Sequence, residues 1–88
     1  MICRKGVVKG KVQGVCFRAF TKATAEKYDV KGYAKNLVDG SVEVLLCGEF
    51  ANVDQVEKAL FVGPERSRVD SVSMVEQDCT PQTGFQIL

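Results

Sequence analysis

The sequence predicts a single α+β domain, residues 1–88, in which two helices cover one face of an antiparallel β-sheet. Of the 88 residues, 45% are hydrophobic and 26% are charged, which suits one compact core but not two. The apolar spacing switches between the period of strands and the period of helices in the order β-α-β-β-α-β, with a short strand at the end. Because two helices cannot cover both faces of so wide a sheet, the other face is expected to lie toward solvent.

The first strand and the first helix are expected on either side of a glycine loop. Residues 2–9 alternate loosely and predict a strand that ends at Gly10. From Phe17 the apolar spacing becomes helical, and this amphipathic helix should extend to about Tyr28. Asp29 follows, and Asp is one of the few non-glycine residues that adopt the left-handed conformation that often ends a helix.

Asp39 and Gly40 predict a tight hairpin, because glycine readily adopts the positive φ that such a turn needs. Strands are expected at about 32–37 and 42–47 on either side of this turn. Alternate residues of the second strand should face opposite sides of the sheet. One face would carry Val42, Val44 and Leu46, and the other would carry Glu43, Leu45 and Cys47.

A second helix and two further strands complete the predicted fold. Asn52 is expected to cap the helix, and Gly63-Pro64 should end it. Its apolar stripe comprises Val53, Val56 and Leu60. The last strands are expected at 67–76 and 85–88. A right-handed crossover makes the first two strands parallel and leaves a gap for the third strand, so the expected architecture is a ferredoxin-like sandwich.

The composition argues against several classes of function. The net charge is +1 with no long basic run, so no nucleic-acid partner is expected. No apolar segment has the length of a membrane span or a signal peptide, so we expect a cytoplasmic protein without membrane contact. We also expect a monomer. The chain has no histidine and no C-x-x-C pair. A structural zinc site and catalysis by Ser-His or Cys-His pairs are therefore not expected.

The stretch "GKVQGVCFR", residues 10–18, places glycines and an arginine at the start of the first helix. The free N–H groups of a helix N-terminus suit a phosphate. Gly14 would let successive amides point inward, and Arg18 would add a planar, charged fork. The stretch alone leaves open an ordinary turn with a solvated arginine. Asn36 would come near this loop and orient a water, although a turn asparagine is the alternative.

Three motifs together closely resemble the acylphosphatase family: "GKVQGVCFR", "GYAKNLVDGSVEV" and "SRVDSV". The resemblance covers nearly the whole chain, with the same order of elements. It implies hydrolysis of the carboxyl-phosphate bond of small acyl phosphates without a metal or other cofactor. It also implies that Arg18 binds phosphate and that Asn36 positions the attacking water. The tail "FQIL" lacks the basic or aromatic ending of many relatives, so the role of the C-terminus stays open.

The chemistry of an acyl phosphate fits these residues. A carboxylate is a good leaving group, so positioning and charge stabilisation suffice. The expected catalytic residues are Arg18 and Asn36, and the phosphate-binding loop comprises Gln13, Gly14, Val15, Cys16, Phe17 and Arg18. The alternative is a non-catalytic ferredoxin-like module that binds anions and regulates another process, because this fold hosts many functions.

The four cysteines divide into three cases. Cys16 is expected to be a small buried packing residue rather than a nucleophile. Cys3 and Cys47 should lie opposite each other on the solvent-side face of adjacent antiparallel strands. They are either free thiols, as a reducing compartment predicts, or close enough to form a disulfide on oxidation. Cys79 falls in a loop and is expected to be incidental.

Overall fold

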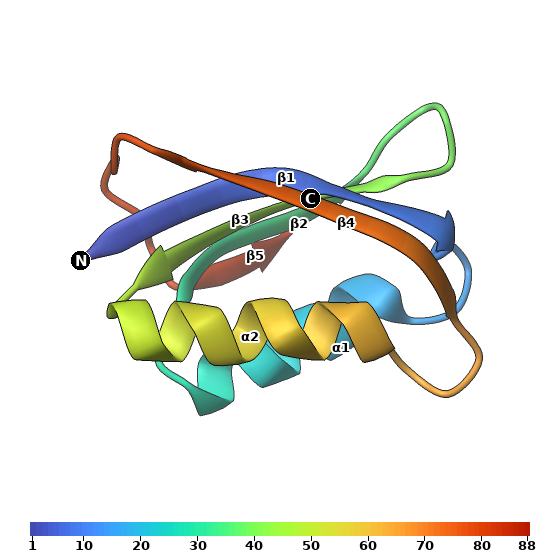
Figure 1. The fold of residues 1–88 in the computed structure, drawn as a ribbon, viewed down its shortest axis with the longest axis horizontal. Coiled ribbons are helices and arrows are strands. Elements are labelled where there is room, and N and C mark those ends of the chain that lie inside the picture. Colours follow the sequence, from blue (N-terminus) through green and yellow to red (C-terminus); the bar gives the residue numbers. More distant parts are fainter.

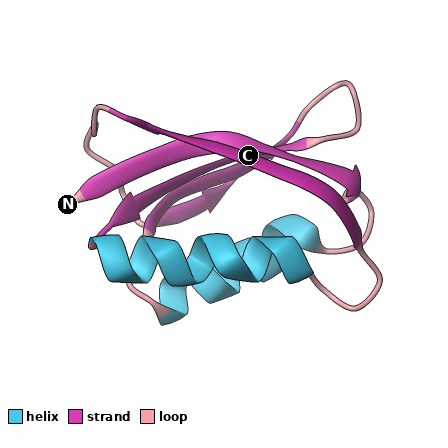
Figure 2. Ribbon diagram, viewed as in Figure 1, coloured by secondary structure: helices cyan, strands magenta, loops and turns pink.

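A computed structural model describes residues 1–88 and has the predicted order of elements. The strands and helices are β1 (Ile2–Lys11), α1 (Phe17–Lys27), β2 (Lys31–Asn36), β3 (Val42–Gly48), α2 (Phe50–Val62), β4 (Arg68–Gln77) and β5 (Phe85–Ile87). Both helices lie against the same face of one five-stranded sheet, and no helix covers the other face (Figures 1 and 2). The predicted ferredoxin-like α+β sandwich is confirmed. No helix of the chain has both the length and the apolar character needed to cross a membrane.

The sheet has the strand order β4-β1-β3-β2-β5. β3 lies between β1 and β2, as the right-handed crossover predicts, and it is antiparallel to both. The short strand β5 instead pairs in parallel with β2, with Gly32 opposite Phe85. The sheet is therefore mixed rather than wholly antiparallel, because the loop after β4 carries the chain across to the far edge before β5 begins.

The ends of the helices agree in part with the prediction. Asp29 has φ 55°, so the left-handed residue after α1 is where it was expected. The predicted cap at Asn52 is wrong, because α2 begins at Phe50 with Glu49 in the capping position. The amide of Val53 donates to the Glu49 carbonyl oxygen at 2.9 Å, which places Asn52 inside the first turn.

The main core lies between the sheet and the two helices. Val42, Val44 and Leu46 of β3 all face it and are fully buried, as the alternation of this strand predicts. They pack in one cluster with the apolar stripe of α2, which comprises Val53, Val56 and Leu60. Phe17 joins the same cluster at 1% exposure. The core therefore fixes β3, which pairs with the strand that carries Asn36, and the first residue of α1, which lies next to Arg18.

The opposite face of the sheet is not uniformly exposed. Cys3, Leu45 and Cys47 form a small buried cluster there, with Tyr33 packed against it. Cys3 and Cys47 lie opposite each other on the predicted face, but they are only 1% and 3% exposed, so the expected contact with solvent is wrong. The loop after β4 explains the difference, because it brings the sulfur of Cys79 to within 4.8 Å of both other sulfur atoms.

Candidate active site

One cavity of about 400 Å³ brings the glycine loop, the start of α1 and the end of β2 together. Arg18 and Asn36, which sequence reasoning singled out from separate elements, both line it. The remaining lining residues are Val12, Gly14, Cys16, Phe17, Ala19 and Ile87. No carboxylate is among them, and Arg18 supplies the only formal positive charge. The cavity is therefore electrostatically suited to an anion.

The backbone of the loop has the alternating conformation of an anion-binding nest. Gly14 has φ 73° and Cys16 has φ 64°, whereas Val15 between them keeps a negative φ. Alternation of this kind turns successive N–H groups toward one concave side. The side chain of Val15 is buried, at 8% exposure. Burial of this side chain anchors the loop to the core, and Gly14 and Cys16 on either side of it line the cavity.

The N-terminus of α1 adds further unpaired donors. The first backbone hydrogen bond into the helix runs from the Phe20 amide to the Cys16 carbonyl oxygen at 2.9 Å. The amides of the residues before Phe20 therefore have no acceptor within the helix. No side chain caps this end, and the first turn contains no acidic residue. The partial positive charge of the helix end thus remains available to a ligand in the cavity.

Arg18 is held at the mouth of the cavity by the C-terminal segment. Its Nη1 donates to a main-chain oxygen of Leu88 at 2.8 Å. This contact uses one of the five N–H donors of the guanidinium group and leaves the others free. Leu88 and the cavity-lining Ile87 were not predicted as site residues. The contact of Leu88 leaves no signal in the sequence, because a main-chain oxygen accepts a hydrogen bond whatever the side chain is.

Gln13 has a different place from the one expected. It does not line the cavity, and its Nε2 donates to the carbonyl oxygens of Leu37 and Ser41, both at 2.8 Å. These two carbonyls lie on either side of the β2–β3 turn. The side chain of Gln13 therefore ties the glycine loop to the hairpin, and a direct side-chain contact with phosphate is not available while both bonds persist.

Asn36 is the last residue of β2, directly opposite Val42 of β3. Its Oδ1 is buried without a hydrogen-bond partner in the chain, and it is the only buried side-chain nitrogen or oxygen in this position. A buried amide oxygen without a partner costs about 1–3 kcal/mol. Asn36 also lines the cavity, so this unpaired oxygen belongs to a residue at the cavity wall.

Cys16 is exposed, so the prediction of a buried packing residue is wrong. The left-handed conformation of this residue turns its side chain out of the core, and the neighbours Val15 and Phe17 are buried instead. The residue nevertheless lines the cavity. Within the cavity lining there is no histidine or carboxylate that would serve it as a base.

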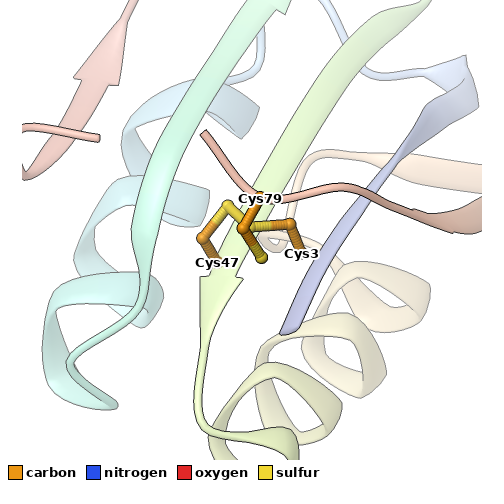
Figure 3. Close-up of side chains that lie close together, drawn as sticks. All are labelled: Cys3, Cys47 and Cys79. Carbon is orange, nitrogen blue, oxygen red and sulfur yellow. A yellow bond between two sulfur atoms is a disulfide. The ribbon is translucent and has the colours of Figure 1, made fainter. Parts of the chain in front are cut away.

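Cys3 and Cys47 lie at the other end of the sheet, away from the cavity. They occupy directly opposed positions of β1 and β3. Their Cα atoms are 4.1 Å apart, within the limit of about 7 Å for a disulfide, and their sulfur atoms are bonded to each other. Figure 3 shows the Cys79 side chain beside this bond.

The comparisons with known proteins agree with this geometry. The acylphosphatase family model matches residues 4–87. A curated acylphosphatase of Chromohalobacter salexigens is 48% identical over 97% of this chain and 94% of its own length. An acylphosphatase of Vibrio vulnificus is 45% identical over 98% of this chain and 96% of its own length.

Solved structures show the same fold. The chain is similar to a Bacillus subtilis acylphosphatase with a TM-score of 0.97 and 32% identity, covering 100% of this chain and 99% of that one. A Coxiella burnetii acylphosphatase has a TM-score of 0.95 and 33% identity, covering 99% of this chain and 92% of that one. The family model and these full-length relatives together show that the chain belongs to the acylphosphatase family, the hydrolases that act on acyl phosphates.

Proposed function

We propose that this chain hydrolyses acyl phosphates in the cavity between the glycine loop and β2, with Arg18 as the phosphate-binding residue and Asn36 as the residue that positions water. The observation that carries the proposal is the shared cavity. It combines a fixed guanidinium group, free helix amides and a buried carboxamide oxygen that lacks a partner. Each of these groups supplies one requirement of phosphoryl transfer.

The phosphoryl group would bind with its oxygens toward the amides that follow Gly14 and toward Arg18. Charge on these oxygens changes as the bond to the carboxylate breaks, and donors fixed before the reaction stabilise that charge without reorganising. The hydrogen bond to the main-chain oxygen of Leu88 holds the guanidinium group in place for this role. Gln13 acts as a positioning residue through its two bonds to the hairpin.

Asn36 would hold the attacking water on the side of the phosphorus atom opposite the leaving group. Its Oδ1 accepts a hydrogen bond from the water, which directs an oxygen lone pair of the water at phosphorus. The phosphorus–oxygen bond to the acyl group then breaks, and its electrons leave on the carboxylate. The proton of the water passes to a phosphate oxygen of the substrate. Because the leaving group is good, this route needs neither a histidine nor a metal.

Hydrolysis of acetyl phosphate by the purified chain tests the proposal. We expect Arg18→Ala and Asn36→Ala each to lower kcat/KM by a factor of about 10²–10³, while a metal chelator leaves the wild-type rate unchanged. Arg66→Ala and Asn52→Ala are matched controls, since both residues lie outside the cavity. Retention of activity in either site variant would contradict the assigned roles, and wild-type protein without turnover would favour a non-catalytic anion-binding module.

We also propose that the chain acts as a monomer, because every group assigned a role in the reaction comes from one chain. Sedimentation at the concentration of the activity assay tests this. A dimer whose dissociation abolishes hydrolysis would contradict it.

A further inference from the structure

We propose that Cys79 is the attacking thiol of an intramolecular thiol–disulfide exchange site, whose other members are Cys3 and Cys47. The three sulfur atoms all lie within 4.8 Å of one another, although the residues come from β1, β3 and the loop after β4. Cys3 and Cys47 are joined as a disulfide, and Cys79 is free and exposed. A thiol held beside a disulfide is the arrangement that exchange requires. Figure 3 shows this arrangement.

A cavity next to the disulfide indicates which of its sulfur atoms Cys79 attacks. The cavity has a volume of about 360 Å³ and is lined by both Cys47 and Cys79, whereas Cys3 is not part of its wall. Both bonded cysteines are otherwise buried, at 1% exposure for Cys3 and 3% for Cys47. Cys47 is therefore the sulfur atom that Cys79 can approach from open space.

The loop that carries Cys79 can accommodate the small movement that bond formation needs. Residues 78–83 contain no helix or strand, and they connect the end of β4 to the start of β5. The remaining wall of the cavity comes from the same loop and from two chain segments beside it, with the lining residues Met1, Lys31, Thr80, Pro81 and Gln82. Cys79 can thus approach Cys47 without disturbing the paired strands.

The exchange is balanced without an oxidant or a reductant. Cys79 loses its thiol proton, and its sulfur attacks the Sγ of Cys47. A Cys47–Cys79 bond forms as the Cys3–Cys47 bond breaks, and the electron pair of the broken bond stays on the sulfur of Cys3, which takes up a proton. Both forms contain one disulfide and one thiol among the three residues, so the number of free thiols in the chain does not change.

The two forms expose different sulfur groups to solvent. In the starting form the disulfide is buried and the thiol of Cys79 is exposed. In the exchanged form one sulfur of the disulfide belongs to the surface loop, and the free thiol is that of the buried Cys3. Exchange therefore gives a low-molecular-weight thiol a surface disulfide to attack, although the original bond is shielded from it. The proposed reaction does not involve the phosphate cavity, so it stands independently of the proposed function.

Disulfide mapping in variants that each lack one cysteine tests whether Cys79 attacks Cys47 rather than Cys3. Trypsin places the cysteines in separate peptides, 1–4, 12–18, 36–58 and 69–88. Reduced Cys3→Ser and Cys47→Ser proteins are treated with oxidised glutathione, quenched by alkylation and digested. We expect the link between 36–58 and 69–88 in Cys3→Ser to form at least about tenfold faster than the link between 1–4 and 69–88 in Cys47→Ser. Equal rates, or glutathione adducts in place of the first link, would overturn the proposal.

Reduction kinetics test the exchange without altering either bonded cysteine. Oxidised wild type and Cys79→Ser are treated with the same concentration of reduced glutathione, and loss of the Cys3–Cys47 disulfide is followed by mapping. We expect reduction to be at least about tenfold slower in Cys79→Ser, because the surface route is lost. Cys16→Ser is the matched control and should be reduced at the wild-type rate. Equal rates in wild type and Cys79→Ser would overturn the proposal, even if Cys3→Ser fails to fold.

Discussion

The two ends of β3 lie in regions that are stabilised by different interactions. Near Val42, the site depends on backbone conformation and on hydrogen bonds from side chains such as Gln13 to main-chain carbonyls. Near Cys47, the structure depends on close contact between strands and on a sulfur–sulfur bond. The candidate site and the disulfide therefore lie at opposite ends of one strand. Substitutions at the two ends should therefore fail in different ways.

Gly32, at the cysteine end of β2, gives the largest expected effect. It has φ 142°, and a Cβ added to it would overlap the carbonyl oxygen of Leu45 in the neighbouring strand. We expect Gly32→Ala to cost more than about 4 kcal/mol and to leave little folded protein. Urea unfolding measures this. Gly48→Ala is the control, since its Cβ would make ordinary contacts, and equal losses in both variants would contradict the argument.

The disulfide should come next in size. Reduction of the Cys3–Cys47 bond is expected to lower the free energy of unfolding by about 2–4 kcal/mol, because the bond closes a long loop in the unfolded chain. The residues are 44 apart in the sequence. Chemical unfolding of oxidised and reduced protein gives the value. If the two ends are separate, kcat of the folded reduced protein will stay within about twofold of the oxidised value, and a large loss of kcat would refute their separation.

Gly14→Ala tests the end of the sheet that carries the candidate site, and it should lower stability less than the two changes above. The φ of Gly14 is 73°, but a Cβ would meet no atom within 4 Å, so Gly14→Ala should cost only about 1 kcal/mol. The altered backbone should nevertheless misdirect the nest amides and lower kcat/KM by about tenfold or more. Gly84 is a matched control with φ 64° and the same open surroundings. Gly84→Ala should lose similar stability and keep its activity, and the reverse result would contradict the assignment.

Tyr33 gives the smallest expected effect, and it depends on pH. Burial, its hydrogen bond to Glu43 at 2.7 Å and the charge of Glu43 raise the pKa of Tyr33 from 10.0 to about 12. A raised pKa means that the protonated phenol favours the folded state. Its contribution is therefore constant below pH 10 and is lost as the pH rises toward 12. Unfolding free energies at about pH 9 and 11 should differ more in wild type than in Tyr33→Phe, and identical differences would contradict this.

Much of the fold followed from local patterns in the sequence. The alternation in β3 placed Val42, Val44 and Leu46 in the core, and the turn residue Asp29 was correctly expected to be left-handed. The cap at Asn52 was wrong, because a helix can begin with a backbone bond to Glu49 that leaves no side-chain signal. The parallel pairing of β5 also escaped prediction, since it depends on where a long loop crosses.

The residues of the candidate site could be predicted from the sequence better than the contacts and backbone conformation that hold them in place. Arg18 and Asn36 were expected to meet, and they line one cavity. The outward direction of Cys16 was missed, because it results from a left-handed φ that a non-glycine residue seldom adopts. The contact of Arg18 with Leu88 was missed because it joins residues 70 positions apart in the sequence through a main-chain oxygen. The expectation of a cytoplasmic location remains a prediction.

Inhibition of acetyl phosphate hydrolysis by inorganic phosphate tests whether Arg18 binds phosphate and Asn36 positions water, because it measures phosphate binding separately from turnover. We predict that Arg18→Ala raises the competitive inhibition constant of phosphate by about 100-fold, because a charged hydrogen-bonding partner is lost. Asn36→Ala should keep that constant within about threefold while its kcat falls by about 10²-fold or more. Unchanged phosphate inhibition in Arg18→Ala, or equal weakening in both variants, would contradict the proposed division of roles.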